Sequence, residues 1–173
     1  MEPLTPADIA RIRSDEALQA RLGEEITRLI GGSPASTRIG PFVRSLRSLP
    51  RGLRAMAATY ELDVSMALDA LEDHFVNWHH KALAQETLRG LRVLGAREEA
   101  MVFEQAFGLA SRHWRRLGTG VPDLDSALYR KFEPLNARLW RLLGYQGHTG
   151  RSLLTRWAPY ARAHPDEVCV MPT

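Results

Sequence analysis

The spacing of apolar residues along the chain predicts helices nearly throughout. The clearest run covers residues 50–75, where apolar side chains recur every three or four positions and share one face of a helical wheel. That face consists of Leu53, Met56, Ala57, Tyr60, Val64, Ala67, Leu68, Leu71 and Phe75. No stretch alternates apolar and polar residues over the length that a strand requires. The pattern therefore predicts an all-α fold.

Capping residues and helix breakers place the other helices. An N-terminal helix is expected over about residues 6–30, because Thr5 and Pro6 are residue types that start helices and Gly31 and Gly32 end the apolar periodicity. Further helices are expected over about residues 81–94, 98–116, 126–143 and 151–163, and residues 33–41 are expected to form a loop.

These elements predict a single domain, residues 1–173, built as a bundle of about six helices with short loops. Residues 166–173 are expected to form an irregular tail. Pro134 lies inside one of the predicted helices and is expected to kink it or to split it in two.

Composition narrows the class of protein. The 173 residues are 45% hydrophobic and 25% charged, which is typical of a globular protein. No apolar run approaches the roughly 18 residues that a membrane-spanning helix needs. The first residues do not combine a basic segment with an apolar one, as a secretory signal would. Cys169 is the single cysteine, so no internal disulfide framework exists, and we expect a cytoplasmic protein without a membrane partner.

The net charge of +3 conceals three blocks of opposite sign. Residues 26–60 carry six arginines and no acidic residue. Residues 61–104 carry nine acidic residues and four basic ones, and residues 105–165 carry ten basic residues and three acidic ones. Blocks of this kind predict separate surfaces of opposite charge.

The first candidate site is an acidic helix face opposite the apolar stripe. Leu62 and Met66 lie beside this face, and an exposed apolar pair rimmed by acids is typical of a protein interface. The candidate protein-binding residues are Glu61, Leu62, Met66, Asp69, Glu72 and Asp73. They would bind another protein with a basic surface, such as a nucleic-acid-binding protein or a toxin, or a second copy of the chain in a homodimer. In the alternative interpretation, another helix covers Leu62 and Met66 and the acids face solvent.

The second hypothesis is direct binding of nucleic acid by arginines. The residues that would contact phosphates are Arg44, Arg47, Arg51, Arg54, Arg112, Arg115 and Arg116. No nucleic-acid-binding signature accompanies them. Arginine outnumbers lysine 21 to 2, as a biased genomic base composition would produce, so arginine clusters can also arise without a role in binding.

The third hypothesis is a metal-dependent enzyme at the helix junction over residues 72–80, within the segment LEDHFVNWHH. Its candidate ligands are Asp73, His79 and His80. Asp73 and His80 are seven residues apart, about 10 Å along an unbroken helix, so they could hold one ion only if the chain bends. Asn77 could form that bend, because asparagine tolerates the left-handed conformation of a helix end. Paired catalytic motifs are absent from the sequence, which favours a non-enzymatic role and predicts no cofactor.

Several segments match a known family. They are LPRGLRAMAATYELDV, HFVNW, ETLRGLRVLGAREEA, VPDLDSALY and WAPYARAHPDEV. Through them, residues 49–168 resemble the DNA-mimic-protein family, an all-helical family catalogued as a domain of unknown function. The resemblance implies a family-like core over about residues 49–165. The resemblance implies that Phe75 and Asn77 form a helix-end signature and that Gly95 and Ala96 join two helices.

The resemblance also carries expectations about shape and function. Family members often have two glycines where this chain has Asp69 and Ala70, so we expect the helix to continue unbroken through these positions. Acidic members of the family imitate DNA phosphates toward a DNA-binding protein. Because the net charge here is +3, only the local acidic block could do so. That block consists of Glu61, Asp63, Asp69, Glu72 and Asp73.

Overall fold

A computed structural model describes residues 2–31, 39–119 and 126–170. Most of these residues are helical and none of them is in a strand. The prediction of an all-α fold is therefore confirmed for the described part of the chain. Ten α-helices and two 3-10 helices occur there, more than the expected six, because several predicted helices are broken and one was missed. The helices are α1 (Pro6–Arg11), α2 (Asp15–Ile30), α3 (Ile39–Ser48), α4 (Arg51–Leu68), α5 (Leu71–Asn77), α6 (Lys81–Val93), α7 (Arg97–Arg112), α8 (Trp114–Leu117), α9 (Ser126–Leu143), η2 (Leu153–Arg156), α10 (Trp157–Ala163) and η3 (Pro165–Glu167).

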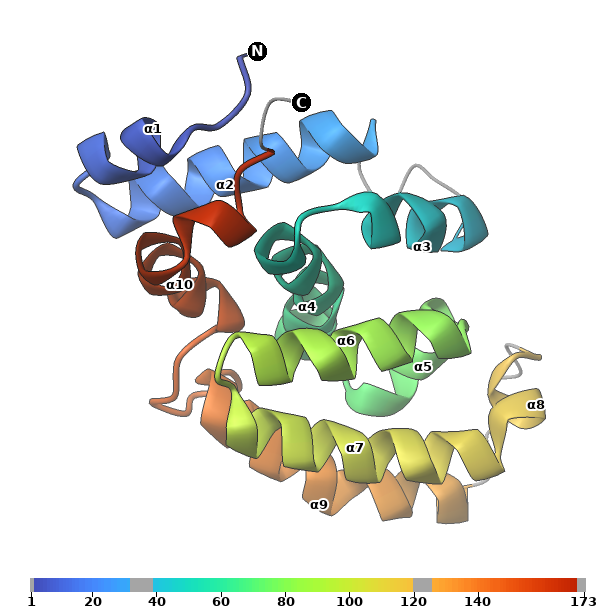
Figure 1. Cartoon of the computed structure of the whole chain (residues 1–173). Coiled ribbons are helices and arrows are strands. Elements are labelled where there is room, and N and C mark those ends of the chain that lie inside the picture. Colours follow the sequence, from blue (N-terminus) through green and yellow to red (C-terminus); the bar gives the residue numbers. More distant parts are fainter. Residues whose placement is uncertain (1, 32–38, 120–125, 171–173) are drawn as a thin grey trace.

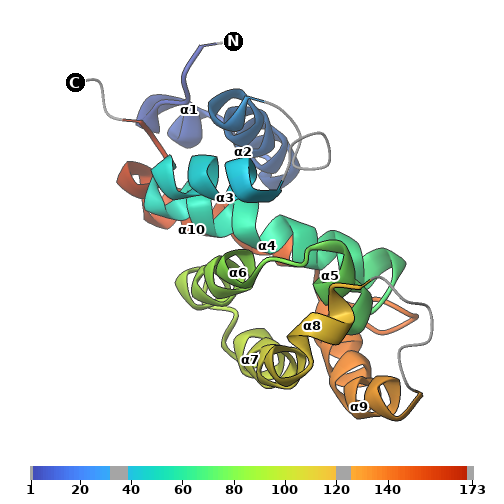
Figure 2. The ribbon, with the colours of Figure 1, turned by 90° about the vertical axis from the view of Figure 1, so that its right-hand side faces the viewer.

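Helix α4 lies between two groups of helices (Figure 1; Figure 2). On one side, Leu53 and Met56 of α4 join a hydrophobic core with residues of α1, α2, α3 and α10. On the other side, Leu62 and Met66 join a second core with residues of α5, α7 and α9. Twelve of the eighteen residues of α4 are buried. A helix surrounded in this way has no broad face in contact with solvent. The apolar stripe predicted from its sequence therefore does not identify all of the residues that it buries.

The N-terminal region forms two helices, whereas one helix was expected over residues 6–30. Thr5 caps α1, and Ser14 caps α2 by accepting a hydrogen bond from an amide of its first turn. Between the two helices, the guanidinium of Arg162 in α10 donates hydrogen bonds to the carbonyl oxygens of Ile12 and Arg13. The break is stable because a residue from the other end of the chain satisfies these carbonyl groups.

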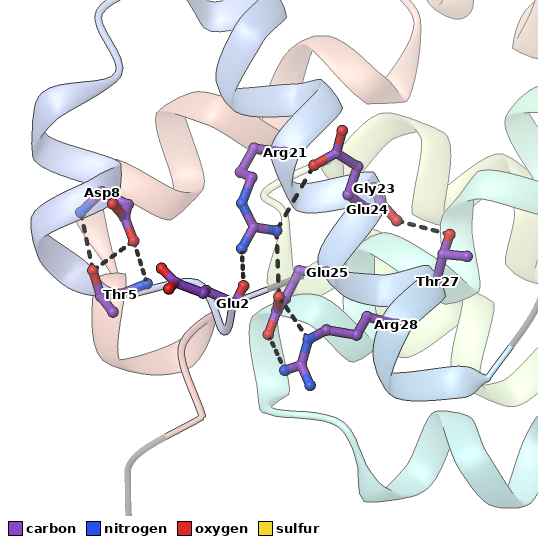
Figure 3. Close-up of polar contacts among 9 residues, drawn as sticks. All are labelled: Glu2, Thr5, Asp8, Arg21, Gly23, Glu24, Glu25, Thr27 and Arg28. Carbon is purple, nitrogen blue, oxygen red and sulfur yellow. Dashed lines mark hydrogen bonds and ion pairs between the residues drawn. The ribbon is translucent and has the colours of Figure 1, made fainter.

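A buried carboxylate fixes the first residues against α2 (Figure 3). Glu25 is fully buried and accepts hydrogen bonds from Arg21 and Arg28, and Arg21 also donates to the carbonyl oxygen of Glu2. Burial alone would raise the pKa of Glu25, but the hydrogen bonds from Arg28 and the Leu4 amide lower it. Glu25 is therefore held as an anion within the fold.

Two further differences from the predicted helices concern α3 and Pro134. Helix α3 was not predicted, although it buries Phe42, Val43 and Leu46 against the first core. Pro134 lies inside α9 without splitting it.

Three predicted segments lie partly outside the described residues. They are residues 33–38 of the predicted loop, residues 121–125 of the segment VPDLDSALY and residues 171–173 of the tail. In the described part of the chain, no helix combines the length and the apolar character needed to cross a membrane.

Candidate functional site

The candidate site is built around a break between α4 and α5. Helix α4 ends at Leu68 and α5 begins at Leu71, so the expectation of an unbroken helix is wrong. Two side chains of α9 bind the polar backbone groups at the break. Trp140 Nε1 donates to the carbonyl oxygen of Met66 at 3.0 Å, and Asn136 Oδ1 accepts from the Leu71 amide at 2.9 Å. These contacts replace hydrogen bonds that a continuous helix would make.

Four carboxylates gather at this break, from the C-cap of α4, from α5 and from α9. We call Asp69, Glu72, Asp73 and Glu133 the acidic patch. Asp69 and Glu133 are exposed, Asp73 is half-buried, and Glu72 is buried with a hydrogen bond from Asn136 Nδ2 at 2.8 Å. In the described part of the chain, no ion pair joins any of the four to a basic residue.

The electrostatics of the acidic patch show that its carboxylates repel one another. Burial raises the pKa of Glu72, and the charges of Asp73 and Glu133 raise it further. Burial likewise raises the pKa of Asp73, with an additional contribution from Asp69. A cation placed against the patch would lower these pKa values and relieve the repulsion.

The other candidate residues of the acidic helix face lie inside the protein. Leu62 and Met66 are 0% exposed, so the expected exposed apolar pair is wrong. They pack in the second core instead. Glu61 is also buried. The reason is that α5, α7 and α9 surround this half of α4, and the periodicity of a single helix does not contain that information.

Asp63, which the family resemblance included in the acidic block, has a role in the fold. Its carboxylate accepts hydrogen bonds from the Tyr145 hydroxyl at 2.7 Å, the Ser152 hydroxyl at 2.8 Å and the Leu153 amide at 2.8 Å. Asp63 thereby ties the segment between α9 and η2 to α4. It is buried, so it is not part of the surface that a partner could touch.

A buried polar group that the sequence did not indicate lies next to the break. The Ser65 hydroxyl donates to the carbonyl oxygen of Glu61 at 2.7 Å and lies 2.9 Å from His74 Nδ1. Since the hydroxyl has one hydrogen, it donates to the Glu61 carbonyl when His74 Nδ1 carries a proton and donates back to Ser65. Burial lowers the pKa of His74 to about 4 and raises the pKa of Glu61 to about 7.

The helix-end residues of the family resemblance have different surroundings. Phe75 is buried, and its ring lies 5.5 Å from that of Phe103 and 6.2 Å from that of Phe107. Asn77 is the last residue of α5 and is exposed. The metal hypothesis allowed Asn77 a left-handed conformation, but among the described residues Gln146 is the only non-glycine residue with a positive φ. Trp78 follows Asn77 as the C-cap of α5.

Gly95 and Ala96 lie between α6 and α7. Gly95 has a φ of +71°, a left-handed conformation that glycine adopts without strain. Ala96 is fully buried in the second core. The pair therefore turns the chain so that α7 packs against α6.

The structure separates the arginines of the nucleic-acid hypothesis into two groups. Arg47 and Arg54 bind the buried carboxylate of Glu86, and Arg51 pairs with Glu167. The charges of these three are already partly neutralised within the fold. The other four are exposed and have no ion pair with any described residue. They are Arg44, Arg112, Arg115 and Arg116.

The residues of the metal hypothesis are not assembled as a ligand set. The chain does bend after α5, but His79 then stacks on Trp114 with the ring centroids 4.4 Å apart. Its Nε2 lies 2.7 Å from the Trp114 carbonyl oxygen. Over the described ranges, no group of three or more His, Cys, Asp and Glu is placed to hold a metal ion, so Asp73, His79 and His80 do not form such a group.

Comparison with known proteins supports the family resemblance. A model of the family described as DMP19-like protein matches residues 47–164, which is more than half of the chain. The chain belongs to this family. The part that matches the DMP19-like family runs from the end of α3 through α10 and includes the acidic patch, whereas α1 and α2 precede it. No curated protein and no solved structure matches the chain.

Proposed function

We propose that this DMP19-like protein is a non-enzymatic interaction module, which binds the basic surface of a nucleic-acid-binding protein through the acidic patch. The observation that carries the proposal is the set of carboxylates at the α4–α5 break, which no described basic residue neutralises. Membership of the DMP19-like family supports it, because acidic members of the DNA-mimic-protein family imitate DNA phosphates.

The chemistry of the acidic patch suits a partner with arginine and lysine side chains. A basic group arriving at Asp69, Asp73 and Glu133 would form charge-assisted hydrogen bonds with them. It would also offset the mutual repulsion that, after burial, contributes to the raised pKa of Asp73 and Glu72. Charge complementarity of this kind contributes to the association rate and to specificity.

The positive charge elsewhere on the molecule restricts how a basic partner can approach. The chain carries +3 overall, and exposed arginines such as Arg44 and Arg115 would repel the partner. Docking is therefore favoured only where the acidic patch faces the partner. The patch acts as a local imitation of a phosphate array on a protein that is otherwise basic.

The test compares two charge-neutralised variants of the full chain. The patch variant carries Asp69→Asn, Asp73→Asn and Glu133→Gln, and retains Glu72 because this residue holds Asn136. The matched control carries Glu2→Gln, Glu98→Gln and Asp166→Asn, three exposed acidic residues outside the patch. Each protein is used to capture partners from a nuclease-treated lysate of the source organism, and duplex DNA is then added as a competitor.

We expect wild type and control to capture the same nucleic-acid-binding protein, and duplex DNA to release it. The patch variant should capture at least about tenfold less, because three charge-assisted contacts are lost. Capture by the patch variant at the wild-type level would contradict the proposal. So would a partner that duplex DNA does not displace.

A further inference from the structure

A second charged surface, of opposite sign to the acidic patch, lies where α6 begins and α7 ends. Helices α6 and α7 run in opposite directions, so the start of α6 and the end of α7 lie at the same end of the pair, next to α8 (Figure 1). A hollow of about 470 Å³ opens there. We call it the basic hollow; its lining residues are Lys81, Ser111, Arg112, His113, Trp114 and the pair Arg115 and Arg116.

The basic hollow concentrates positive charge without a counter-charge. Lys81, Arg112, Arg115 and Arg116 are exposed, and none has an ion pair among the described residues. The lining contains no aspartate or glutamate. By contrast, the arginines around Glu86 and Glu25 are paired within the fold. The basic hollow is therefore a place where the fold leaves several cations available.

The start of α6 adds to this excess. Lys81 is the first residue of the helix, where the helix dipole favours negative charge rather than positive. The N-cap residue, His80, makes no side-chain capping hydrogen bond, and the first turn contains no acidic residue. An anion in the basic hollow would compensate both Lys81 and the uncapped helix start.

Aromatic contacts of His79 and Trp114 support the basic hollow. The ring of His79 stacks on Trp114, and Lys81 Nζ lies 5.6 Å from the centroid of the Trp114 ring. Gly118 leaves no room for a side chain, because a Cβ atom there would come within 2.4 Å of the His79 ring. These contacts hold Lys81 beside the α7–α8 junction.

We propose that the basic hollow binds the phosphates of a nucleic-acid strand. Several cations around one hollow match successive phosphates of a strand, and guanidinium groups bind phosphate oxygens in pairs. A hollow of about 470 Å³ has the size of a small-ligand site and can admit a nucleotide unit. His79 stacks on the ring of Trp114 and Lys81 Nζ also lies over it. Recognition is therefore assigned to the phosphate backbone and not to base stacking.

This inference goes beyond the proposed function, which concerns only the acidic patch. A chain with both surfaces could hold a nucleic-acid-binding protein at the acidic patch while the basic hollow contacts nucleic acid. The two sites have different residues, and neutralising the acidic patch removes charges that repel a strand, so the patch variant should bind a strand at least as tightly as the wild type does. Failure of one proposal is thereby distinguishable from failure of the other.

The test measures binding of a fluorescent twelve-nucleotide oligothymidylate by anisotropy over a range of salt concentrations. We expect log Kd to rise with log salt concentration with a slope of about 2–3, since each phosphate contact on a single strand contributes about 0.7. Lys81→Gln and Arg115→Gln should each lower the slope by about 0.7. The matched control is Arg141→Gln, which changes an exposed arginine in the last turn of α9, outside the basic hollow.

A third variant introduces a negative charge at the helix start. His80 has the extended backbone of an N-cap residue, so His80→Asp should cap α6 and place a carboxylate beside Lys81. We expect this variant to weaken oligonucleotide binding at least as much as Lys81→Gln does. Equal affinity of His80→Asp and wild type would overturn the proposal, and so would equal losses in Lys81→Gln and in Arg141→Gln.

Two further probes identify the source of the anion. Tripolyphosphate tests whether a small phosphorylated ligand is sufficient, and a polyglutamate peptide tests whether negative charge alone is sufficient. We expect the oligonucleotide to bind at least tenfold more tightly than either of them. The assignment to a nucleic-acid strand would be overturned if the protein bound tripolyphosphate but not the oligonucleotide. It would also be overturned if polyglutamate bound as tightly as the oligonucleotide.

Discussion

Trp140 Nε1 donates a hydrogen bond to the carbonyl oxygen of Met66, 3.0 Å away, in the last turn of α4. Trp140 and Met66 are 74 residues apart in the sequence. The bond satisfies a carbonyl that the end of α4 leaves without a helical partner. It therefore contributes to the break that exposes Asp69 and creates the acidic patch.

The first prediction compares two tryptophans. Trp140→Phe removes the donor to Met66 and should reduce the free energy of unfolding by about 1–2 kcal/mol beyond the cost of the smaller ring. Trp157 serves as the control, because its Nε1 is buried without a hydrogen-bond partner among the described residues. Trp157→Phe loses the same atoms but no hydrogen bond. Urea unfolding that gives equal losses for both variants would contradict the role of the Trp140 bond.

The second prediction concerns Asp63 and the segment that precedes η2. Asp63→Asn replaces one acceptor oxygen with a donor group. Either the Leu153 amide loses its acceptor, or the Tyr145 and Ser152 hydroxyls lose theirs and must accept from the new amide group instead. We expect a loss of about 2–3 kcal/mol in the free energy of unfolding and faster amide hydrogen exchange over residues 144–153. Tyr145→Phe removes a single bond and should cost only about 1 kcal/mol.

The same substitution should change the titration of Tyr145. Burial and the hydrogen bond to Asp63 raise the pKa of Tyr145 to about 12. Asp63→Asn removes the negative charge beside the hydroxyl, so the pKa of Tyr145 should fall. Absorbance of tyrosinate during alkaline titration measures this shift. An unchanged titration, together with unchanged hydrogen exchange, would contradict the role of Asp63.

The third prediction concerns stability as a function of pH near the α4–α5 break. Burial raises the pKa of Glu61 from 4.5 to about 7 in the folded state. As pH rises through this window, the unfolded chain releases the proton while the folded protein retains it, so stability falls by up to about 3 kcal/mol. His74 acts in the opposite direction. Its folded pKa of about 4 lies below 6.5, so its contribution to stability is lost as pH falls from 6.5 toward 4.

Glu61→Gln separates these two effects. At pH 8 the variant should be more stable than wild type by up to about 3 kcal/mol, and at pH 4.5 the difference should be small. With Glu61 removed, the opposing loss from His74 between pH 6.5 and 4 should become visible. Thermal unfolding across this range measures both slopes. Glu98→Gln makes the same chemical change at an exposed site and should alter neither slope. A pH-independent effect of Glu61→Gln would show that Glu61 is ionised in the folded state.

The fourth prediction concerns the arginines around Glu86. The buried Glu86 carboxylate accepts hydrogen bonds from Arg47, Arg54 and Arg89. Glu86→Gln leaves three guanidinium groups without their shared counter-charge and should cost about 2–3 kcal/mol. Sulfate should restore part of this loss by binding between the arginines. The measurement is the melting temperature in sodium sulfate and in sodium chloride of equal ionic strength, and an equal sulfate effect on wild type would contradict the prediction.

Much of the helical pattern could be predicted because its signals are local. Thr5 and Pro6 start α1, Gly31 ends α2 with a φ of +79°, and Gly95 separates α6 from α7. Caps and breakers of this kind act within about four residues of the helix end. Helix α3 was missed because the predicted loop over residues 33–41 included its first residues.

The candidate site could be predicted only in part. Asp69 and Asp73 were identified from the sequence, and the structure leaves both accessible to a partner. Glu133 was missed, because it lies on α9, more than fifty residues away in the chain. Leu62 and Met66 were assigned to the surface because a helical wheel compares the faces of one helix and contains no information about its neighbours.

The sequence by itself determined the all-α class, the family and the positions of the locally capped helix ends. Tertiary structure decided where α4 stops, because Trp140 and Asn136 of α9 bind backbone groups that a continuous helix would have satisfied internally. It also decided which charges are available. Glu86 and Glu25 form ion pairs with arginines inside the fold. The charged residues of the acidic patch and of the basic hollow form no such pairs among the described residues, so they can interact with solvent or a partner. Pairing of charges depends on distances across the fold, and these arise only when the helices pack.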